Sequence, residues 1–296
     1  MAHPRIDLHL HSNFSDGVQS PTELMVTAKN EGLDVVALTD HDTTAGWDEA
    51  REACSNLGMT FVPGVEMSAS LYGHSIHVLG YLVDPDNDDF AAECSKTRDD
   101  RVARFEAMVE RIHEDHGGMT VEFAYSFHRE GATLGRPTIA RALVDLGIVN
   151  SVDEAFTGIL APDNREYYVG HYAPTVSTAV EVISKAGGVA VLAHPWTSTR
   201  ASLGGFEERG IDPRAYLQSL VDVGLAGLEV HHSENSTHGK EQLLRFAAEF
   251  DLIVTGSSDY HGPGMKPILP GAHTTSEANF ERILARGSGQ RVVRAQ

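Results

Sequence analysis

The segment Asp7-Leu8-His9-Leu10-His11 decides the fold, because it is a short strand-like run that carries two imidazoles on one side. Polar and apolar residues alternate, so His9 and His11 point to one side of an extended chain while the leucines point to the other. By strand geometry the two imidazoles are about six to seven ångströms apart, and they can converge on one metal ion near the strand end. The pair alone fits equally well a half-buried edge strand with two hydrogen-bonded histidines.

Later apolar runs of the chain are also bordered by metal-binding residue types. The run 35–39 leads into Asp40-His41-Asp42, and the run 61–65 leads into Glu66. The other members of the pattern are His77 before the run 78–81, His194 after 189–193, Glu229 and His232 after 227–228, and Asp259 and His261 after 253–258. In a βα barrel such positions face one rim, where these enzymes carry out their chemistry. The pattern therefore predicts one shared site built from many strand ends.

Apolar, β-branched runs alternate with segments of helical period, which indicates βα units and a mainly parallel sheet. The predicted strands are residues 5–10, 34–39, 60–66, 76–82, 189–193, 226–231 and 252–257. The predicted barrel helices are residues 21–32, 44–57, 175–187, 212–223, 236–250 and 276–286. Asp40 and Thr175 stand near helix starts, and Gly32, Gly58, Gly187 and Gly224 stand where helices should end.

The interval from about 90 to 172 breaks this alternation. It offers a long charged helix around 90–116 and shorter helical pieces near 136–147 and 151–160, but no clear strand. We therefore predict a barrel domain from residues 1–90 and 173–296 and an inserted helical subdomain at 91–172. The stretch from Trp196 to Gly205 is predicted to be a flexible loop at the mouth of the site.

Composition limits the kinds of partner. The chain has 296 residues, 41% of them hydrophobic, and a formal charge of −19 from 23 basic and 42 acidic residues. Binding to duplex DNA is largely neutralisation of phosphates by Lys and Arg, so this charge disfavours it. We find no signal peptide or membrane span and expect a cytoplasmic protein without a membrane partner. Cys54 and Cys94 lack CxxC spacing and are predicted to be buried and reduced.

All candidate ligands are nitrogen and oxygen donors, which suits Zn²⁺, Mn²⁺ or Fe²⁺. Clustered cations about 3.5–4 Å apart can hold both the attacking and the leaving oxygen of a phosphoryl transfer, and a water bridging them loses a proton near neutral pH. We therefore expect hydrolysis of a phosphate ester by attack of a metal-bridging hydroxide. A metal-dependent amidohydrolase or deaminase uses similar ligands, but such barrels usually carry a carboxylated lysine, and no lysine ends a predicted strand here. A non-catalytic metal-binding module is disfavoured, since it would not need buried polar groups at every strand end.

Five motifs resemble those of the PHP (polymerase and histidinol phosphatase) superfamily over nearly the whole chain. They are His9-Leu-His11-Ser, Thr39-Asp40-His41-Asp42, the Glu66 strand, Ala193-His194-Pro195 and Ser258-Asp259-Tyr260-His261-Gly. The resemblance implies an α/β fold, a distorted (β/α)7 barrel, with two to three divalent metal ions (Mn, Fe or Zn) in a trinuclear site. It assigns His9, His11, Glu66 and Asp259 to one metal, Glu66, His77 and His194 to a second, and Asp16, His41 and His261 to a third. Asp16 stands where some members have histidine.

The same resemblance implies which residues carry the reaction and what the substrate is. The catalytic set is His9, His11, Glu66, His194, Asp259 and His261. The chain length, the inserted helices and the segment Leu134-Gly135-Arg136-Pro137-Thr138-Ile139-Ala140-Arg141 resemble the TrpH-type branch, although many relatives have histidine where Thr138 stands. That branch includes phosphatases of nucleoside 3′,5′-bisphosphates and 5′-to-3′ exonucleases on short RNA. The implied partner is a small phosphorylated substrate, a nucleotide or short oligoribonucleotide, with histidinol-phosphate phosphatase as the alternative.

Three further residues are candidate substrate contacts. Arg136 stands at a predicted helix start, where a guanidinium and free backbone N–H groups can hold a phosphate. His232 and His238 follow the Glu229 strand and can touch substrate or give a proton to the leaving oxygen. Each of the three equally fits an ordinary surface salt bridge or loop hydrogen bond. Asp42 and Glu229 either orient ligating imidazoles or serve as cap and surface carboxylates.

Overall fold

The computed structural model describes residues 3–72, 74–128, 134–197, 203–206 and 209–294. The chain forms two compact units, one from residues 1–94 and 173–296 and the other from residues 95–172. Residues 198–202 and 207–208, part of the predicted loop at the mouth of the site, lie outside the described residues. Within the described ranges, no helix is both long and apolar enough to cross a lipid bilayer.

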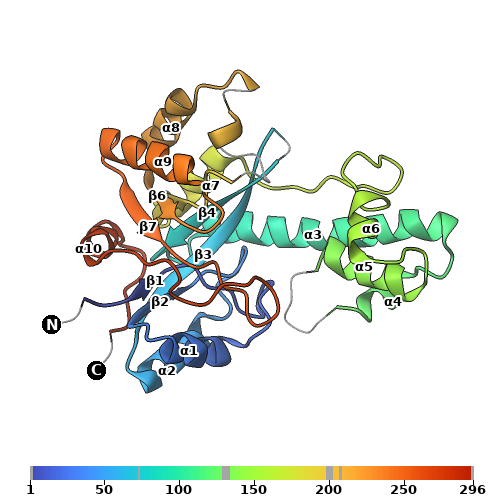
Figure 1. Ribbon diagram of the computed structural model, residues 1–296, viewed down its shortest axis with the longest axis horizontal. Coiled ribbons are helices and arrows are strands. Elements are labelled where there is room, and N and C mark those ends of the chain that lie inside the picture. The colour runs from blue at the N-terminus through green and yellow to red at the C-terminus, as the bar shows by residue number, and fades with distance from the viewer. Residues whose placement is uncertain (1–2, 73, 129–133, 198–202, 207–208, 295–296) are drawn as a thin grey trace. The chain divides into compact units, whose positions relative to one another are not determined.

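The first unit is a nearly closed seven-stranded barrel whose strands follow one another in chain order (Figure 1). The strands are β1 (Ile6–Asp7), β2 (Val35–Leu38), β3 (Thr60–Leu71), β4 (His74–Tyr81), β5 (Val189–Leu192), β6 (Leu225–His231) and β7 (Ile253–Gly256). Beyond β1 and β7, the amide of His11 donates to the carbonyl of Tyr260 at 2.9 Å, and the amide of Asp259 donates to the carbonyl of His9 at 3.0 Å. These bonds join the last strand to the first. The α/β barrel is the fold that the sequence predicts.

Two of the strand predictions need correction. The strand predicted at residues 5–10 is regular only at Ile6–Asp7, because residues 9–11 bond partly to the segment after β7 and partly to the end of β2. The sheet is also less parallel than expected, since β4 runs antiparallel to both β3 and β5. Only residues 72 and 73 separate β3 from β4, which is a hairpin connection and too short for a helical crossover.

The antiparallel β4 explains why His77 opens an apolar run instead of following one. His77 is paired with Ser68 of β3, beyond Glu66. The start of an antiparallel strand lies beside the end of its neighbour, so His77 lies near the rim at which the parallel strands end. The hairpin thus brings the ligand of β4 to the rim at which the parallel strands end.

Six helices surround the sheet (Figure 1): α1 (Pro21–Asn30), α2 (Trp47–Leu57), α7 (Val176–Lys185), α8 (Pro213–Asp222), α9 (Thr237–Glu249) and α10 (Glu277–Arg286). The four glycines predicted at helix ends all have positive φ, between 62° and 113°. Thr175 caps α7, as predicted, by accepting a hydrogen bond from the amide of Thr178. The prediction for Asp40 is wrong: α2 begins at Trp47, and Asp40 instead binds Ser12 and Ser15.

Alternate residues of the strands enter two different apolar clusters. Val36 and Leu38 of β2 pack with the helices, in a cluster that includes Leu24, Trp47 and Leu217. Val35 and Ala37 belong to a second cluster made mainly of strand residues, which Phe280 and Ile283 of α10 join. The second cluster fills the barrel below the site. Both cysteines are buried and free, as predicted.

The second unit is helical. It contains most of α3 (Asp88–Asp115), with α4 (Val121–Tyr125), α5 (Arg136–Asp145) and α6 (Val152–Thr157). Phe105, Ile112, Leu143 and Leu160 belong to its own apolar core. The sequence did not predict α4, because its five residues are too few to show a helical period.

Candidate active site

Histidine and carboxylate side chains from the ends of the barrel strands meet in three overlapping groups. In each group the possible ligand atoms lie within 4.8 Å of one another. We call His9, His11, Glu66 and Asp259 the inner group, and His11, Asp16, His41 and His261 the outer group. The third group joins Glu66 with His41 and His77. Together with His194, these groups contain all nine metal ligands that the sequence predicts.

The inner group is buried and compact. Glu66 Oε2 lies 3.2 Å from His9 Nε2 and 3.1 Å from His11 Nε2. Asp259 Oδ1 lies 3.4 and 3.2 Å from the same two nitrogens. Ligand atoms that each lie about 2.1 Å from one metal ion are separated by about 3.0–3.4 Å at octahedral or tetrahedral angles. The spacing of the four side chains therefore suits a single small divalent cation.

The outer group is looser and more exposed. Asp16 Oδ1 lies 3.3 Å from His261 Nε2 and 3.6 Å from His11 Nδ1, and its Oδ2 lies 3.7 Å from His41 Nε2. The side chain of Asp16 is 39% exposed, against 12% or less for its three histidine partners. Asp16 is carried by a turn between β1 and α1 and not by a strand.

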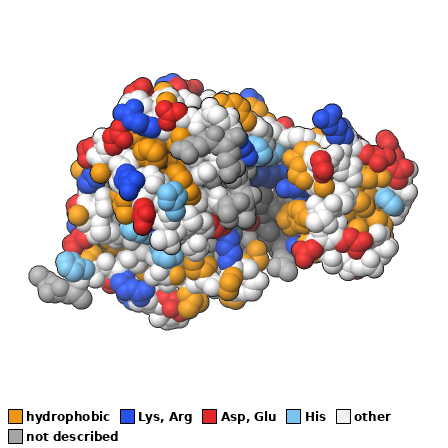
Figure 2. Space-filling view, turned by 45° about the horizontal axis from the view of Figure 1, so that its top comes forward, with side chains coloured by type: hydrophobic (Ala, Val, Ile, Leu, Met, Phe, Trp, Pro, Cys, Tyr) orange, Lys and Arg blue, Asp and Glu red, His pale blue; other side chains and the backbone are white. Residues whose placement is uncertain are grey.

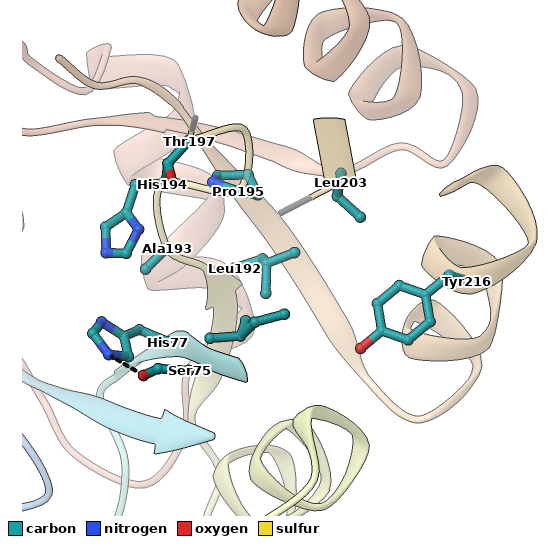
Figure 3. A pocket seen from close by; sticks show the side chains of 10 residues that line it. Ser75, His77, Leu192, Ala193, His194, Pro195, Thr197, Leu203 and Tyr216 are labelled. Atoms are coloured by element: carbon teal, nitrogen blue, oxygen red, sulfur yellow. Dashed lines mark hydrogen bonds between the residues drawn. The ribbon is translucent and has the colours of Figure 1, made fainter. Parts of the chain in front are cut away.

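Glu66 joins the groups through its two oxygens. Its Oε2 faces the imidazoles of His9, His11 and His41, and its Oε1 lies 2.9 Å from His77 Nδ1 and 3.3 Å from His194 Nε2. Figure 3 shows His77 and His194 side by side at one end of a small pocket, with their ring centroids 5.4 Å apart. Five imidazoles around one buried carboxylate suit a residue that bridges metal ions.

Glu229 contacts the ring of His9 and the backbone amide of His194. Its Oε1 lies 2.9 Å from His9 Nδ1 and also accepts a hydrogen bond from Ser257, while its Oε2 accepts from the amide of His194 at 2.8 Å. A carboxylate on the distal nitrogen fixes the ring orientation of a ligating histidine and increases its basicity. Of the two predicted orienting carboxylates, Glu229 contacts an imidazole of the site, whereas Asp42 accepts hydrogen bonds from the amide and hydroxyl of Ser68.

Other polar contacts around the ligands were not visible in the sequence. Asp40 accepts hydrogen bonds from Ser12 and Ser15, and Ser15 Oγ lies 3.4 Å from His11 Nδ1. Ser75 Oγ lies 3.1 Å from His77 Nε2, as the dashed line in Figure 3 marks. Serine is too common for its spacing to signal such a role. Only the fold identifies these hydroxyls as partners of the imidazoles.

Backbone conformation at the strand ends is unusual. Asp42, His194 and Asp259 have φ values of 56°, 30° and 54°, which non-glycine residues rarely adopt. Such conformations cost about 1–3 kcal/mol each and persist where the surrounding structure holds them. Asp42 follows the bridge residue His41, His194 lies two residues after the end of β5, and Asp259 lies three residues after the end of β7. The turns aim the side chains of His194 and Asp259 into the site.

The mixture of charges shifts the pKa values of the site strongly. Burial opposes protonation of His11, but the carboxylates of Asp259, Glu66 and Asp16 outweigh it and raise its pKa to about 10. Burial also opposes ionisation of Glu66, yet His9, His41 and His77 hold its pKa well below the usual range. For His41, burial dominates and lowers the pKa to about 4. A cation in the site would take the place of these protons.

The donor set fits divalent metal ions. Within the described residues, His9 Nε2, His11 Nε2 and His41 Nδ1 are buried and have no hydrogen bond of acceptable geometry. Buried polar nitrogens without a partner cost free energy, so such atoms normally bind something. Each of these nitrogens faces carboxylate oxygens at 3.1–3.4 Å. Imidazole and carboxylate donors together suit zinc, manganese or iron.

The predicted substrate contacts lie in different places. His232 is buried beside the inner group, with its Nε2 3.7 Å from Asp259 Oδ2. His238 lines a separate pocket of about 500 Å³ with Trp196, Arg214 and Gln242. Arg136 belongs to the second unit, where it donates to the carbonyl of Leu160 and lies over the rings of Phe156 and Tyr168.

The structure adds two candidate residues that the sequence does not single out, Lys266 and Asp7. Lys266 lines the pocket that holds Asp16, Glu66 and Asp259, and its ammonium lies 2.5 Å from Asp259 Oδ2. Burial raises the pKa of Asp7 to about 6, although the amides of Gly271, Ser258 and His9 donate to its carboxylate. Lys266 belongs to no motif in the sequence, and Asp7 is predicted only as the start of the first strand.

Comparison with known proteins identifies relatives of the whole chain. Residues 7–129 match the PHP domain. A 5′-3′ exoribonuclease from Haemophilus influenzae is 32% identical over 88% of this chain and 90% of its own. A 3′,5′-nucleoside bisphosphate phosphatase from Chromobacterium violaceum is 32% identical over 88% of each chain. A crystal structure from Bifidobacterium adolescentis, of a protein classed by prediction as a metal-dependent phosphoesterase, superposes with a TM-score of 0.83 at 36% identity over 97% of this chain and 98% of that one.

The barrel, the strand-end groups and these relatives define a metal-dependent hydrolase that acts on phosphoesters. The metal ions that it uses are divalent. The chain belongs to the PHP family, and within that family to the TrpH-like branch, as its motifs predict.

Proposed function

We propose that this chain hydrolyses a phosphoester of a nucleotide, either the 3′-phosphomonoester of a nucleoside 3′,5′-bisphosphate or the phosphoester at the 5′ end of short RNA. The arrangement of five imidazoles around the buried carboxylate of Glu66 carries the proposal. The names of the two relatives from Haemophilus influenzae and Chromobacterium violaceum support the substrate class.

The residues would hold the metal ions in three positions. His9, His11, Glu66 and Asp259 would bind the first, Glu66 with His77 and His194 the second, and Asp16 with His41 and His261 the third. His11 also belongs to the outer group, and His41 also belongs to the group of Glu66 and His77, so each imidazole could bind a neighbouring ion instead. When bound, divalent ions lower the pKa of water and stabilise the charge that develops on the phosphoryl oxygens.

Protein groups would orient the ester and its surroundings. Glu229 and Ser257 fix the ring of His9, and the turn at Asp259 holds its carboxylate toward the inner group. His232, beside Asp259, would give a proton to the leaving oxygen. His238 would contact the nucleoside from the pocket beside Trp196.

The charge distribution on the surface favours a small substrate over a long nucleic-acid duplex. On the described part of the face shown in Figure 2, acidic, basic and apolar side chains are interspersed. With a formal charge of −19, the chain gains little from counterion release on a duplex. Bound cations can still make the site itself positive.

A substrate panel tests the proposal. The metal-stripped protein is reconstituted with Mn²⁺, Fe²⁺ or Zn²⁺ and offered nucleoside 3′,5′-bisphosphates, 5′-mononucleotides, 5′-phosphorylated short RNAs, histidinol phosphate and amide or amino substrates. We expect release of phosphate or nucleotide from the bisphosphate or RNA, and none of ammonia. His9→Ala and Asp259→Ala should be inactive but folded. Full activity after chelation, or a preference for histidinol phosphate, would overturn the proposal.

A further inference from the structure

Lys266 lies in the segment that follows β7 and returns to the site. Gly262 and Gly264 have φ values of 107° and 80°, a conformation that favours glycine, and they turn the chain back after His261. Seven residues after Asp259, the side chain of Lys266 again lines the same pocket. The loop therefore brings the ammonium group of Lys266 back to the end of β7.

Asp7 anchors both ends of this loop. Its Oδ1 accepts a hydrogen bond from the amide of Ser258 at 3.2 Å, and its Oδ2 accepts from the amide of Gly271 at 2.7 Å. The carboxylate is fully buried. Because Asp7 holds both ends, the loop that carries Lys266 begins and ends beside the segment that contains His9 and His11.

The contacts of Lys266 connect it to the inner group through one carboxylate. Asp259 Oδ1 faces His9 and His11, whereas Asp259 Oδ2 lies 2.5 Å from Lys266 Nζ. Glu234 Oε1 lies 3.3 Å from the same ammonium. The lysine side chain is 36% exposed, so its ammonium stands at the boundary between the buried ligands and solvent.

Lys266 differs in charge from the rest of the pocket. Among the described residues that line it, three are carboxylates, four are histidines, one is Met265, and Lys266 is the single Lys or Arg. A phosphate monoester carries up to two negative charges, and its outer oxygens need donors beyond the ligands of the inner group. An ammonium offers three N–H donors and a permanent charge for this purpose.

We propose that Lys266 binds a non-bridging oxygen of the substrate phosphoryl group. This inference rests on the proposed function, because it concerns the same site and the same ester. Glu234 and Asp259 hold the ammonium at the pocket, and an incoming phosphate oxygen takes one of its three N–H donors. Lys266 is then a phosphate-binding residue of this pocket that acts beside the metal ions.

Binding of inorganic phosphate to the Mn²⁺-reconstituted protein tests this role without requiring turnover. Isothermal titration calorimetry is run on the wild type, Lys266→Met and Lys266→Arg, with the manganese content of each sample measured by mass spectrometry. Lys185→Met is the matched control, because it removes the same charge from an exposed lysine of α7. We expect Lys266→Met to weaken phosphate binding about 10- to 100-fold, the size of a lost charge-assisted hydrogen bond. Lys266→Arg should recover part of the affinity, and Lys185→Met should bind as the wild type does.

Three results would overturn the inference: wild-type protein that binds no phosphate, Lys266→Met that binds it within twofold of the wild type, or a loss of affinity that follows loss of manganese. The last result would mean that Lys266 only supports Asp259 as a ligand. Failure of the proposed function is a separate outcome, because it appears as no hydrolysis in the substrate panel. Phosphate affinity in the calorimeter still decides the role of Lys266 in that case.

Discussion

The inner and outer groups share His11 but are built differently. In the inner group every side chain is at most 5% exposed, and Glu229 and Ser257 support His9 from behind. In the outer group Asp16 is 39% exposed and its distances to the histidines are 3.3–3.7 Å, longer than most of those in the inner group. The same residue types therefore form one buried, closely spaced half of the site and one more exposed, more widely spaced half. We expect the inner half to set catalysis and the outer half to tune it.

The largest effect should come from Glu66→Ala, because this carboxylate belongs to the inner group and also faces His41, His77 and His194. We expect kcat/KM for phosphate release to fall at least about a thousandfold, with loss of bound metal. Kinetics and metal analysis on the same sample measure both. Glu52→Ala, at an exposed position of α2, is the control. An active, metal-loaded Glu66→Ala protein would remove the distinction between the two halves.

A smaller effect is expected from Glu229→Gln, which retains the shape of the side chain but weakens its contact with His9 Nδ1. Loss of such a supporting carboxylate typically costs about 10- to 100-fold in metal affinity or activity. Metal titration followed by calorimetry measures the affinity. Asp42→Asn, at a carboxylate that accepts hydrogen bonds from the amide and hydroxyl of Ser68, should change it much less. Equal losses for the two variants would contradict the orienting role of Glu229.

Asp16→Ala should have a still smaller effect, about tenfold in kcat/KM, because this ligand is half-exposed and loosely held. Histidine is also a good ligand for zinc, manganese and iron, so Asp16→His should restore part of the loss. Competition with a chelator should remove metal from the Asp16→Ala protein before it affects the inner group. If Asp16→Ala is as inactive as Glu66→Ala, the outer group is as essential as the inner one.

The smallest effect concerns the pH dependence of the metal-free protein. Carboxylates overcome burial to raise the pKa of His11 to about 10, so its contribution to stability is complete below about pH 6.5 and is lost as pH rises toward 10. The Tm of the metal-free protein should fall by at least about 3 °C between pH 7 and 10. His41→Ala should leave this fall unchanged, because burial lowers the pKa of His41 to about 4. A fall that persists in His11→Ala would have another origin.

Most of the predicted ligands come together in the structure because they stand beside short apolar runs, whereas Asp16, in a turn, is named only by the family resemblance. His9, Glu66, His194 and Asp259 all belong to strand ends or the turns after them, and the barrel must bring such ends together. The antiparallel β4 was not predicted, because an apolar run in the sequence does not show whether the strand runs parallel or antiparallel to its neighbours. The contact of Ser257 with Glu229 runs between neighbouring strands, and that of Lys266 depends on a loop that returns to the site seven residues after Asp259. No local pattern in the chain reports such a return.

The hydrogen bonds that Asp7 accepts from both ends of the loop after β7 have a consequence for how the family can diversify. These two hydrogen bonds hold residues 258 and 271 next to Asp7. The ends of the loop therefore stay in place when the length of the segment between them changes. Lengthening a closed loop costs little entropy, about 0.6 kcal/mol for each doubling. Residues 267–270 can therefore be exchanged or lengthened as a cassette while Asp259, His261 and Lys266 keep their places. Engineering of substrate choice can begin in that cassette without rebuilding the barrel.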